Sequence, residues 1–386
     1  MTETVNMPQL APRDRCTGCG ACSSGCPKGA IHMVPDREGF LYPEITDGCV
    51  QCGHCAHVCP VQKQREHRTA PQVFAVWSRD GAVRQPSTCG GAFSALAEYV
   101  LEGGGVVFGA ALDNDLRVVH TAVKNVHELH RLRGSKPVQS DMGDAYQQVR
   151  LYLDQGRQVL FSGTPCQVDG LYRYLGEHPE RLLTCDVACG GVCSPGVWAQ
   201  LVKSMAYVKQ HRPTAVEFCG KLTGDRERRF RVQFEGGGRY DAPMGKCELG
   251  RGIARRLFMR PACHHCAYAT TDRPGDVTLG DAFNIVSLFG VEAADHGLGS
   301  LGNPPFTVRA TRERLEAGND RFVLSFMSAD GSYVYARTQE LARAANVYVG
   351  PLAMAHYTVA PRLVQYEFDS LSFEDTTPQG LFLLIR

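Results

Sequence analysis

Hydrophobic and polar positions alternate with two different periods in the middle of the chain, which predicts helices and strands in turn. Apolar residues recur at helical spacing across 92–101, and three consecutive glycines at 103–105 end this helix. The apolar segments 106–112 and 117–123 predict two strands joined by a turn at 113–115. Because helical and extended segments alternate, we expect an α/β body.

The same alternation continues further along the chain. A helix that Asp144 can cap ends at Gly156, and residues 158–162 predict a buried strand. Another helix is expected over 167–175, and the serine-proline pair at 194–195 is a favourable start for a third, which reaches Met205.

Eight cysteines near the N-terminus form two copies of the pattern C-x2-C-x2-C-x3-C-P. This run is typical of bacterial ferredoxins, in which three cysteines hold one [4Fe–4S] cluster and the fourth reaches the other cluster. A zinc site or a disulfide framework is the alternative, but zinc ligands usually come as two pairs. The pattern therefore predicts two [4Fe–4S] clusters and one-electron transfer. The expected ligands are Cys16, Cys19, Cys22 and Cys59 for one cluster, and Cys49, Cys52, Cys55 and Cys26 for the other.

Composition divides the chain into an N-terminal dicluster ferredoxin-like domain and an α/β body, so the fold class is α+β with an α/β main part. The ferredoxin-like domain takes residues 1–65, and the polar segment 62–71 reads as a linker.

Overall composition excludes several classes of partner. The chain has 386 residues, 44% of them hydrophobic, which is enough for two or three hydrophobic cores. Its 41 basic residues are balanced by 40 acidic ones, so the composition does not indicate a nucleic-acid-binding protein. The N-terminus has no basic region followed by an apolar stretch, and no apolar run of about 18 residues suggests a transmembrane segment. The 17 cysteines then read as metal ligands in a reducing cytosol, which predicts a cytoplasmic protein.

The segment S-G-T-P-C-Q at 162–167 lies where a buried strand ends and a helix begins. Ligands of open α/β sheets bind at such junctions, and a helix N-terminus favours a phosphate or a thiolate. The alternative is an ordinary turn, with Cys166 as a small core residue.

Two further cysteine groups suggest a third metal site. Cys263 and Cys266 form a C-x2-C pair beside a proline, and three more cysteines recur every four residues. A structural zinc on the pair, together with His264 or His265, is the competing interpretation. The four thiolates of a cluster would be Cys166, one of Cys185, Cys189 and Cys193, and the pair Cys263 and Cys266.

A series of motifs occurs in one order along the chain. They are S-T-C-G-G-A-F at 87–93, R-G-S-K at 133–136, Q-S-D-M at 139–142, S-G-T-P-C-Q at 162–167, C-G at 189–190, R-P-x-C-x-x-C at 260–266 and G-D-V-T-L-G-D at 275–281. Over about residues 12–285 the chain thereby resembles the coenzyme F420 hydrogenase/dehydrogenase beta subunit family, which includes 7-hydroxymethyl chlorophyll a reductase. The resemblance implies that residues 72–155 and 156–330 are the N-terminal and C-terminal parts of the body, and it leaves 331–386 as an unassigned C-terminal extension.

The resemblance implies an iron–sulfur flavoprotein oxidoreductase that holds FAD in its α/β body. Electrons would pass between the ferredoxin-type clusters and FAD, which exchanges a hydride with coenzyme F420 or another organic two-electron acceptor. The alternative is an electron-transfer subunit of a larger complex without its own substrate site. The implied partners are a redox protein, either a ferredoxin or a hydrogenase or reductase subunit, and a small-molecule substrate.

The family pattern also implies the residues of these sites. Lys136, the candidate catalytic residue, would neutralise phosphate or lie near the N1–C2 edge of the flavin; a solvated loop lysine is the alternative. The third [4Fe–4S] cluster would be bound by Cys166, Cys189, Cys263 and Cys266, with Cys185 or Cys193 as a substitute for Cys189. The flavin-site residues would be Gly90, Gly91, Gly134, Ser135, Lys136, Gln139, Ser140, Asp141, Gly163 and Thr164.

The chain departs from this pattern at several positions. Cys89 stands where the family commonly has serine, and the Cys-His-Gly of the family is Cys-Gly-Gly at 189–191. Residues 286–386 match little of the family pattern. We expect these departures to affect acceptor specificity and partner docking more than other properties.

Overall fold

The computed structural model describes residues 7–62, 73–78, 80–84, 86–88, 90–222, 225–270 and 272–281, and six short strands beyond residue 325. The expected linker therefore lies outside the described residues, apart from Gln62 at its start. Cys89 and most of the expected C-terminal extension lie outside them as well.

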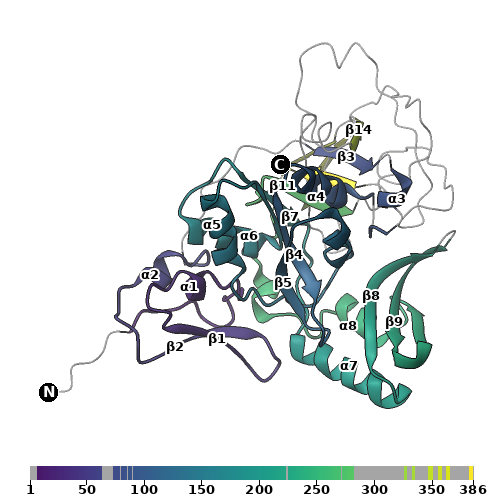
Figure 1. The fold of residues 1–386 in the computed structure, drawn as a ribbon, viewed down its shortest axis with the longest axis horizontal. Helices are drawn as coiled ribbons and strands as arrows, with labels where there is room; N and C mark the ends of the chain where they lie inside the picture. Colours follow the sequence, from purple (N-terminus) through teal and green to yellow (C-terminus); the bar gives the residue numbers. More distant parts are fainter. Residues whose placement is uncertain are drawn as a thin grey trace, which may run out of the picture.

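The N-terminal domain contains one hairpin and two very short helices (Figure 1). Strands β1 (Ile31–Pro35) and β2 (Leu41–Ile45) pair antiparallel. Helices α1 (Ala21–Ser24) and α2 (His54–His57) each begin after a glycine in the left-handed region, Gly20 with φ 80° and Gly53 with φ 72°. Since L side chains rarely adopt this conformation, glycine allows the chain to turn sharply inside each cysteine run.

The body is built on an eight-stranded mixed sheet with the strand order β14-β3-β17-β11-β7-β6-β4-β5. The strands β4, β6, β7 and β11 are parallel to one another, and the remaining pairs are antiparallel. Its strands are β3 (Val73–Ser78), β4 (Val106–Leu112), β5 (Val118–Val123), β6 (Val159–Gly163), β7 (Leu182–Val187), β11 (Val277–Asp281), β14 (Val347–Gly350) and β17 (Phe382–Ile385). Both expected parts of the body thus contribute strands to one sheet.

Helices cover this sheet and connect its parallel strands (Figure 1). They are α3 (Gly81–Arg84), α4 (Ala92–Glu102), the 3-10 helix η1 (Val126–Arg131), α5 (Ala145–Asp154) and α6 (Pro165–Leu175). The expected helices and strands of this region are confirmed, with one shift that matters for the site. Helix α6 begins at Pro165 rather than at Gln167, because proline suits a first helical turn and Thr164 caps it, so Cys166 lies inside the helix.

The hydrophobic core joins the N-terminal domain to the body. Phe108 and Phe161 of the sheet and Val168 and Leu171 of α6 are fully buried in one cluster. Cys19, Ala21 and Val58 of the N-terminal domain belong to that same cluster. The ferredoxin-like domain is therefore packed against the body rather than tethered to it.

A second, antiparallel sheet of three strands lies beside helix α7 (Pro195–Lys209). The helix expected after Ser194 is confirmed, and the Ser194 hydroxyl accepts a hydrogen bond from the Val197 amide at 2.9 Å. Trp198 packs against Phe218 and Phe230 in the core of this region. The elements are β8 (Pro213–Leu222), β9 (Asp225–Phe234), η2 (Glu235–Gly237), β10 (Arg239–Pro243), α8 (Glu248–Ala254) and η3 (Pro261–His265).

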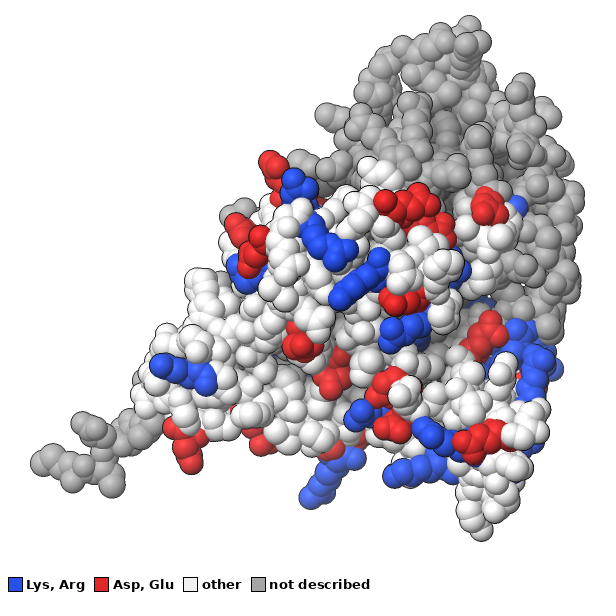
Figure 2. Space-filling view, in the orientation of Figure 1, with Lys and Arg blue, Asp and Glu red and all other residues white. Residues whose placement is uncertain are grey.

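The remaining short strands form two pairs, and the surface carries both signs of charge. Strand β12 (Phe326–Met327) pairs with β13 (Tyr333–Val334), and β15 (Ala355–Thr358) pairs with β16 (Arg362–Gln365). Basic and acidic side chains are interspersed over the face seen in Figure 2, as the balanced composition predicts. Within the described part of the chain, no helix is long and apolar enough to cross a bilayer.

Candidate redox sites

Two small cavities in the N-terminal domain divide its eight cysteines into two groups. Each cavity has a volume of about 20 Å³, and Cys55 borders both of them. The first is lined by Cys16, Cys19, Cys22 and Cys59, and the second by Cys26, Cys49 and Cys52. With Cys55 assigned to the second cavity, these groups are the two ligand sets expected from the spacing. We call them the inner set (Cys16, Cys19, Cys22, Cys59) and the outer set (Cys26, Cys49, Cys52, Cys55).

The two sets differ in burial. Cys16 and Cys19 of the inner set are each 8% exposed, whereas Cys52 of the outer set is exposed and its neighbour Val50 is 57% exposed. Burial is the main reason why the pKa of Cys22 is raised to about 12, and nearby Cys16 and Cys59 raise it further. The inner set therefore faces the body, and the outer set lies near solvent.

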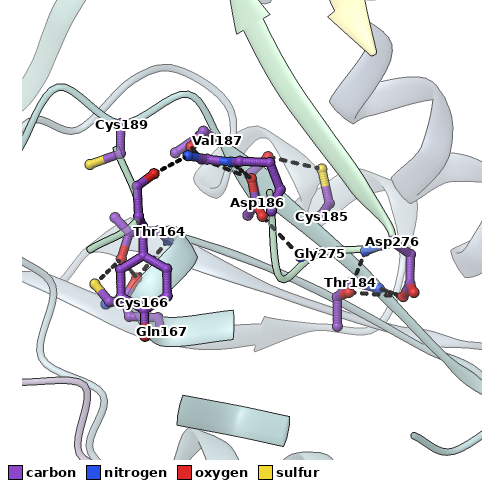
Figure 3. A network of polar contacts seen from close by, with 12 residues as sticks. Thr164, Cys166, Gln167, Thr184, Cys185, Asp186, Val187, Cys189, Gly275 and Asp276 are labelled. Carbon is purple, nitrogen blue, oxygen red and sulfur yellow. Dashed lines mark hydrogen bonds and ion pairs between the residues drawn. The ribbon is translucent and has the colours of Figure 1, made fainter. Parts of the chain in front are cut away.

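Cys166 lies in the first turn of α6, two residues after the N-cap residue Thr164. Thr164 caps the helix: its amide nitrogen lies 2.9 Å and its hydroxyl 3.0 Å from Oε1 of Gln167. The same hydroxyl lies 3.1 Å from the Cys166 sulfur. Burial raises the pKa of Cys166 to about 12, and three neighbouring thiols raise it further. These three thiols are Cys189, Cys263 and Cys266, the partners expected for Cys166. Figure 3 shows the sulfur atoms of Cys166 and Cys189 on the same side of the network.

The alternatives to Cys189 make different contacts. The Cys193 thiol points to the Met259 sulfur at 3.7 Å in the core around Trp198, and of the other cysteines only Cys263 influences its pKa. Cys185 is fully buried, and its pKa is raised by burial and then by Asp186. Because Cys189 acts on the pKa of Cys166 and is itself influenced by Cys263 and Cys266, we take it as the fourth member of this group, which we call the body set (Cys166, Cys189, Cys263, Cys266).

The side chains that could bind a single zinc ion do not lie close together in this region. Among the residues that the structure describes, no three His, Cys, Asp or Glu side chains are close enough to hold one metal ion. The thiolates of a cube each bind a different iron and lie further apart than ligands of one zinc ion. His264 and His265 are exposed, as expected for solvated loop residues.

A buried ion pair fixes the strand end that leads to Cys189 (Figure 3). Arg273 donates to the Asp186 carboxylate at 3.1 Å and to the Val187 carbonyl at 2.6 Å, and the Gly275 amide donates to Asp186 at 2.9 Å. Asp276 accepts from the Thr184 amide at 2.9 Å. The motif at 275–281 therefore holds β7 and β11 in place beside the body set.

A cavity of about 400 Å³ opens beside the carboxyl ends of β6 and β7. Cavities of this size hold organic cofactors, and this position relative to a parallel sheet is where they bind. Seven expected flavin residues line it, together with Cys189 of the body set: Gly91, Gly134, Ser135, Lys136, Ser140, Gly163 and Thr164. Gly91, the N-cap residue of α4, has φ 85° and no side chain to cap the helix, which leaves the first amides of α4 for an anion.

Three expected flavin residues lie outside this lining. The Gly90 carbonyl accepts from the Ser78 amide at 2.7 Å, and the Asp141 carboxylate accepts from the Gly143 amide at 3.0 Å. Gln139 points to the N-terminal domain, where its side-chain amide donates to the Thr17 carbonyl at 3.0 Å. Gln139 is thus a domain-contact residue, which motif order alone does not reveal.

Lys136 lines the cavity and is held by backbone carbonyls, so the solvated-lysine alternative is wrong. Its ammonium donates to the carbonyls of Leu132, Arg133 and Gly134 at 3.3, 2.9 and 3.1 Å. Burial lowers the pKa of Lys136 to about 8. The position fixes a cation at the cavity wall near neutral pH.

Sequence reasoning missed a hydrogen-bonded chain along the cavity wall. His120 lies 2.9 Å from the Ser162 carbonyl through Nε2 and 2.8 Å from the Ser140 hydroxyl through Nδ1. Since a carbonyl only accepts, Nε2 carries the proton, Nδ1 accepts from Ser140, and Ser140 accepts from Gln167 at 2.9 Å. Burial lowers the pKa of His120 to about 4, which keeps the ring neutral. No local motif marks His120, because its partners lie 20 and 42 residues away.

Comparisons with known proteins identify the family of this chain. Residues 73–146 and 156–300 match the N-terminal and C-terminal family models of the coenzyme F420 hydrogenase/dehydrogenase beta subunit, which together span more than half of the chain. Residues 15–63 match the model of a 4Fe-4S dicluster domain.

Individual relatives match less of the chain. An uncharacterised ferredoxin of Methanocaldococcus jannaschii is 37% identical over 51 residues, which cover 13% of this chain and 66% of that ferredoxin. A chain in a xenon-derivatised structure of the F420-reducing [NiFe] hydrogenase complex from Methanosarcina barkeri is similar with a TM-score of 0.39 and 18% identity. This match covers 55% of the present chain and 70% of the hydrogenase chain.

Proposed function

Because the chain belongs to the coenzyme F420 hydrogenase/dehydrogenase beta subunit family and carries a 4Fe-4S dicluster domain, we propose that it is an FAD-dependent oxidoreductase. It passes electrons between [4Fe–4S] clusters and a two-electron substrate. One observation carries the proposal: the outer set, the inner set, the body set and the cavity follow one another from solvent into the α/β body.

The outer set is the entry or exit point for single electrons. Cys52, Gln51 and Val50 form an exposed loop over the second cavity, so a redox partner protein can approach the cluster held there. The inner set cannot serve this purpose as well, because Cys16 and Cys19 are buried against the body.

Helix α6 connects the inner set to the body set. Gly170 in its middle lies against Cys19, and Cys166 lies in its first turn. Electron transfer between clusters needs a short path through packed protein, which this helix provides without a solvent gap. The next group along the path, Cys189, is already part of the cavity wall.

The residues of the cavity fit a bound flavin nucleotide. FAD, when bound, supplies the conversion between one-electron cluster chemistry and two-electron hydride chemistry. The uncapped N-terminus of α4 would bind the diphosphate, and Gly91 keeps side chains out of this approach. The Lys136 ammonium supplies the positive charge for a phosphate or for the reduced ring, and the Ser140 hydroxyl is oriented by Gln167 and His120.

The substrate is coenzyme F420 or another organic acceptor that exchanges a hydride with the flavin. The second candidate function is electron transfer to a catalytic partner subunit, and the match to models of a beta subunit favours it. The two differ in whether the isolated chain turns over a small molecule.

The test is anaerobic purification of the full chain with iron, sulfide and flavin quantification, followed by titration with reduced coenzyme F420. We expect about twelve irons and one FAD per chain, because three cubes hold four irons each. About eight irons without flavin, before and after reconstitution with FAD, would contradict the proposal. Bound FAD that reduced coenzyme F420 does not reduce, but a partner subunit does, would favour the second candidate.

A further inference from the structure

Arg260 is fully buried, yet its side chain reaches out of the body into the N-terminal domain. The guanidinium donates to the Cys16 carbonyl at 2.7 Å and to the Leu41 carbonyl at 3.0 Å, and it lies 3.7 Å from the Cys16 sulfur. It also donates to the Gln139 side-chain oxygen at 2.7 Å. The contact to sulfur comes from Nη2, the nitrogen that also bonds Leu41.

The cysteine loop is shaped to admit this arginine. Gly18, between Cys16 and Cys19, has φ 68°, and a β-carbon there would lie 2.7 Å from Nη1 of Arg260. The ring of Tyr42 stacks on the guanidinium, with its centroid 4.2 Å from Cζ. Any side chain at position 18 would displace Arg260 from the inner set, so the contact of Arg260 with this loop requires glycine there.

Among the described residues, no carboxylate balances the charge of Arg260. Within the described residues no ion pair involves Arg260, and its hydrogen-bond partners are carbonyls, one amide oxygen and the Cys16 sulfur. Burying an unpaired cation is costly, and arginine does not lose its proton in proteins. A cube bound by four thiolates is an anion, and adding an electron makes it more negative. A cluster on the inner set would therefore supply the negative charge that balances Arg260.

We propose that Arg260 is a positioning residue that stabilises the reduced form of the cluster on the inner set and makes it the higher-potential cluster of the N-terminal pair. A hydrogen bond to a ligand sulfur and a nearby cation both favour the reduced cluster. An electron that enters at the outer set is then drawn inward, toward α6 and the body set. The inference rests on one part of the proposed function: the N-terminal domain binds one [4Fe–4S] cluster on the inner set and another on the outer set.

The test is an anaerobic redox titration of the full chain, followed by electron paramagnetic resonance, with Arg260→Met and Arg260→Gln as neutral variants. We expect the higher-potential of the two N-terminal reduction steps to fall by about tenfold in its equilibrium constant, which is about 59 mV for a one-electron couple. The other step stays in place. Unshifted steps, or an equal shift of both, in a variant with wild-type iron content would overturn the inference. Arg260→Gln keeps a hydrogen-bonding side chain, and it supplies the measurement where Arg260→Met does not assemble.

Two further variants separate the charge from domain docking. Arg260→Lys keeps the cation and should retain most of the wild-type potential; a shift as large as that of the neutral variants would contradict a charge effect. Ser194→Ala removes the hydrogen bond from the Ser194 hydroxyl to the Glu38 carbonyl, a domain contact that does not involve Arg260, so we expect no shift. If Ser194→Ala lowers the potential as much as Arg260→Gln, Arg260 acts only by docking. A chain without N-terminal clusters would instead refute the proposed function, and the flavin content affects neither outcome.

Discussion

Gly170 of helix α6 lies directly against Cys19 of the N-terminal domain. A β-carbon on Gly170 would be 3.0 Å from both Cβ and Sγ of Cys19, and 2.8 Å from the Tyr146 hydroxyl. The Tyr146 hydroxyl donates to the Gln167 carbonyl in the same helix at 2.7 Å, so it cannot easily move away. The helix that carries Cys166 is thereby packed on a residue of the inner set.

We expect Gly170→Ala to destabilise the contact between the two domains. Alanine normally stabilises a helix relative to glycine by about 0.5–1 kcal/mol, but overpacking at a buried contact costs about 1–3 kcal/mol. The iron content should fall together with the thermal unfolding midpoint. Gly245→Ala is the matched control, because a β-carbon there meets nothing within 4 Å. A Gly170→Ala protein that is more stable than wild type would show that the helix does not press on Cys19.

A second prediction concerns the fourth ligand of the body set. Cys189→Ser should remove about four irons per chain and leave the N-terminal pair, because one cube holds four irons. Cys193→Ser should keep the wild-type iron content, since the Cys193 thiol points to Met259. Iron and sulfide quantification of the two variants under anaerobic conditions decides between them. Loss of iron in Cys193→Ser with retention in Cys189→Ser would reverse our assignment.

Local patterns predicted most of the elements near the site. The cysteine runs, the helix at Ala92–Glu102 and the strand before Thr164 follow from spacing, capping and periodicity within a few residues. Helix α6 started earlier than expected only because the cap at Thr164 and the proline after it outweigh the apolar pattern.

Contacts between distant residues could not be predicted in this way. Arg260 and Cys16 are 244 positions apart, and Gln139 meets Thr17 over 122 positions. Neither residue type signals such a contact, since a buried arginine and a surface arginine look alike in a single sequence. The role of Lys136 was obscured for the same reason: its partners are carbonyls, which every residue has.

The stability of the chain should depend on pH through His120. The pKa of His120 is about 4 in the folded protein and about 6.5 in the unfolded chain, so only the unfolded chain takes up the proton between these values. Stability is complete above pH 6.5 and falls as the pH drops toward 4. From pH 7 to pH 5 we expect a loss of about 2 kcal/mol from this group.

Urea unfolding at both pH values, followed by circular dichroism, measures this loss against His120→Gln. The variant cannot take up the proton, so its own change with pH should be smaller by about 2 kcal/mol. Equal pH dependence in the two proteins would mean that His120 is protonated in the folded state.

The affinity of the cavity for FAD should fall as the pH rises through about 8. Lys136 has a pKa of about 8 in the free protein, because burial disfavours its charged form. A diphosphate or a reduced ring beside the ammonium would raise this pKa, so binding above pH 8 requires proton uptake and weakens with each further pH unit. Fluorescence titration of the apo-flavin protein with FAD at pH 7 and pH 9.5 measures the effect. In Lys136→Met the affinity should be lower at pH 7 and nearly the same at both pH values. A wild-type affinity that does not change with pH would place the Lys136 charge away from the nucleotide.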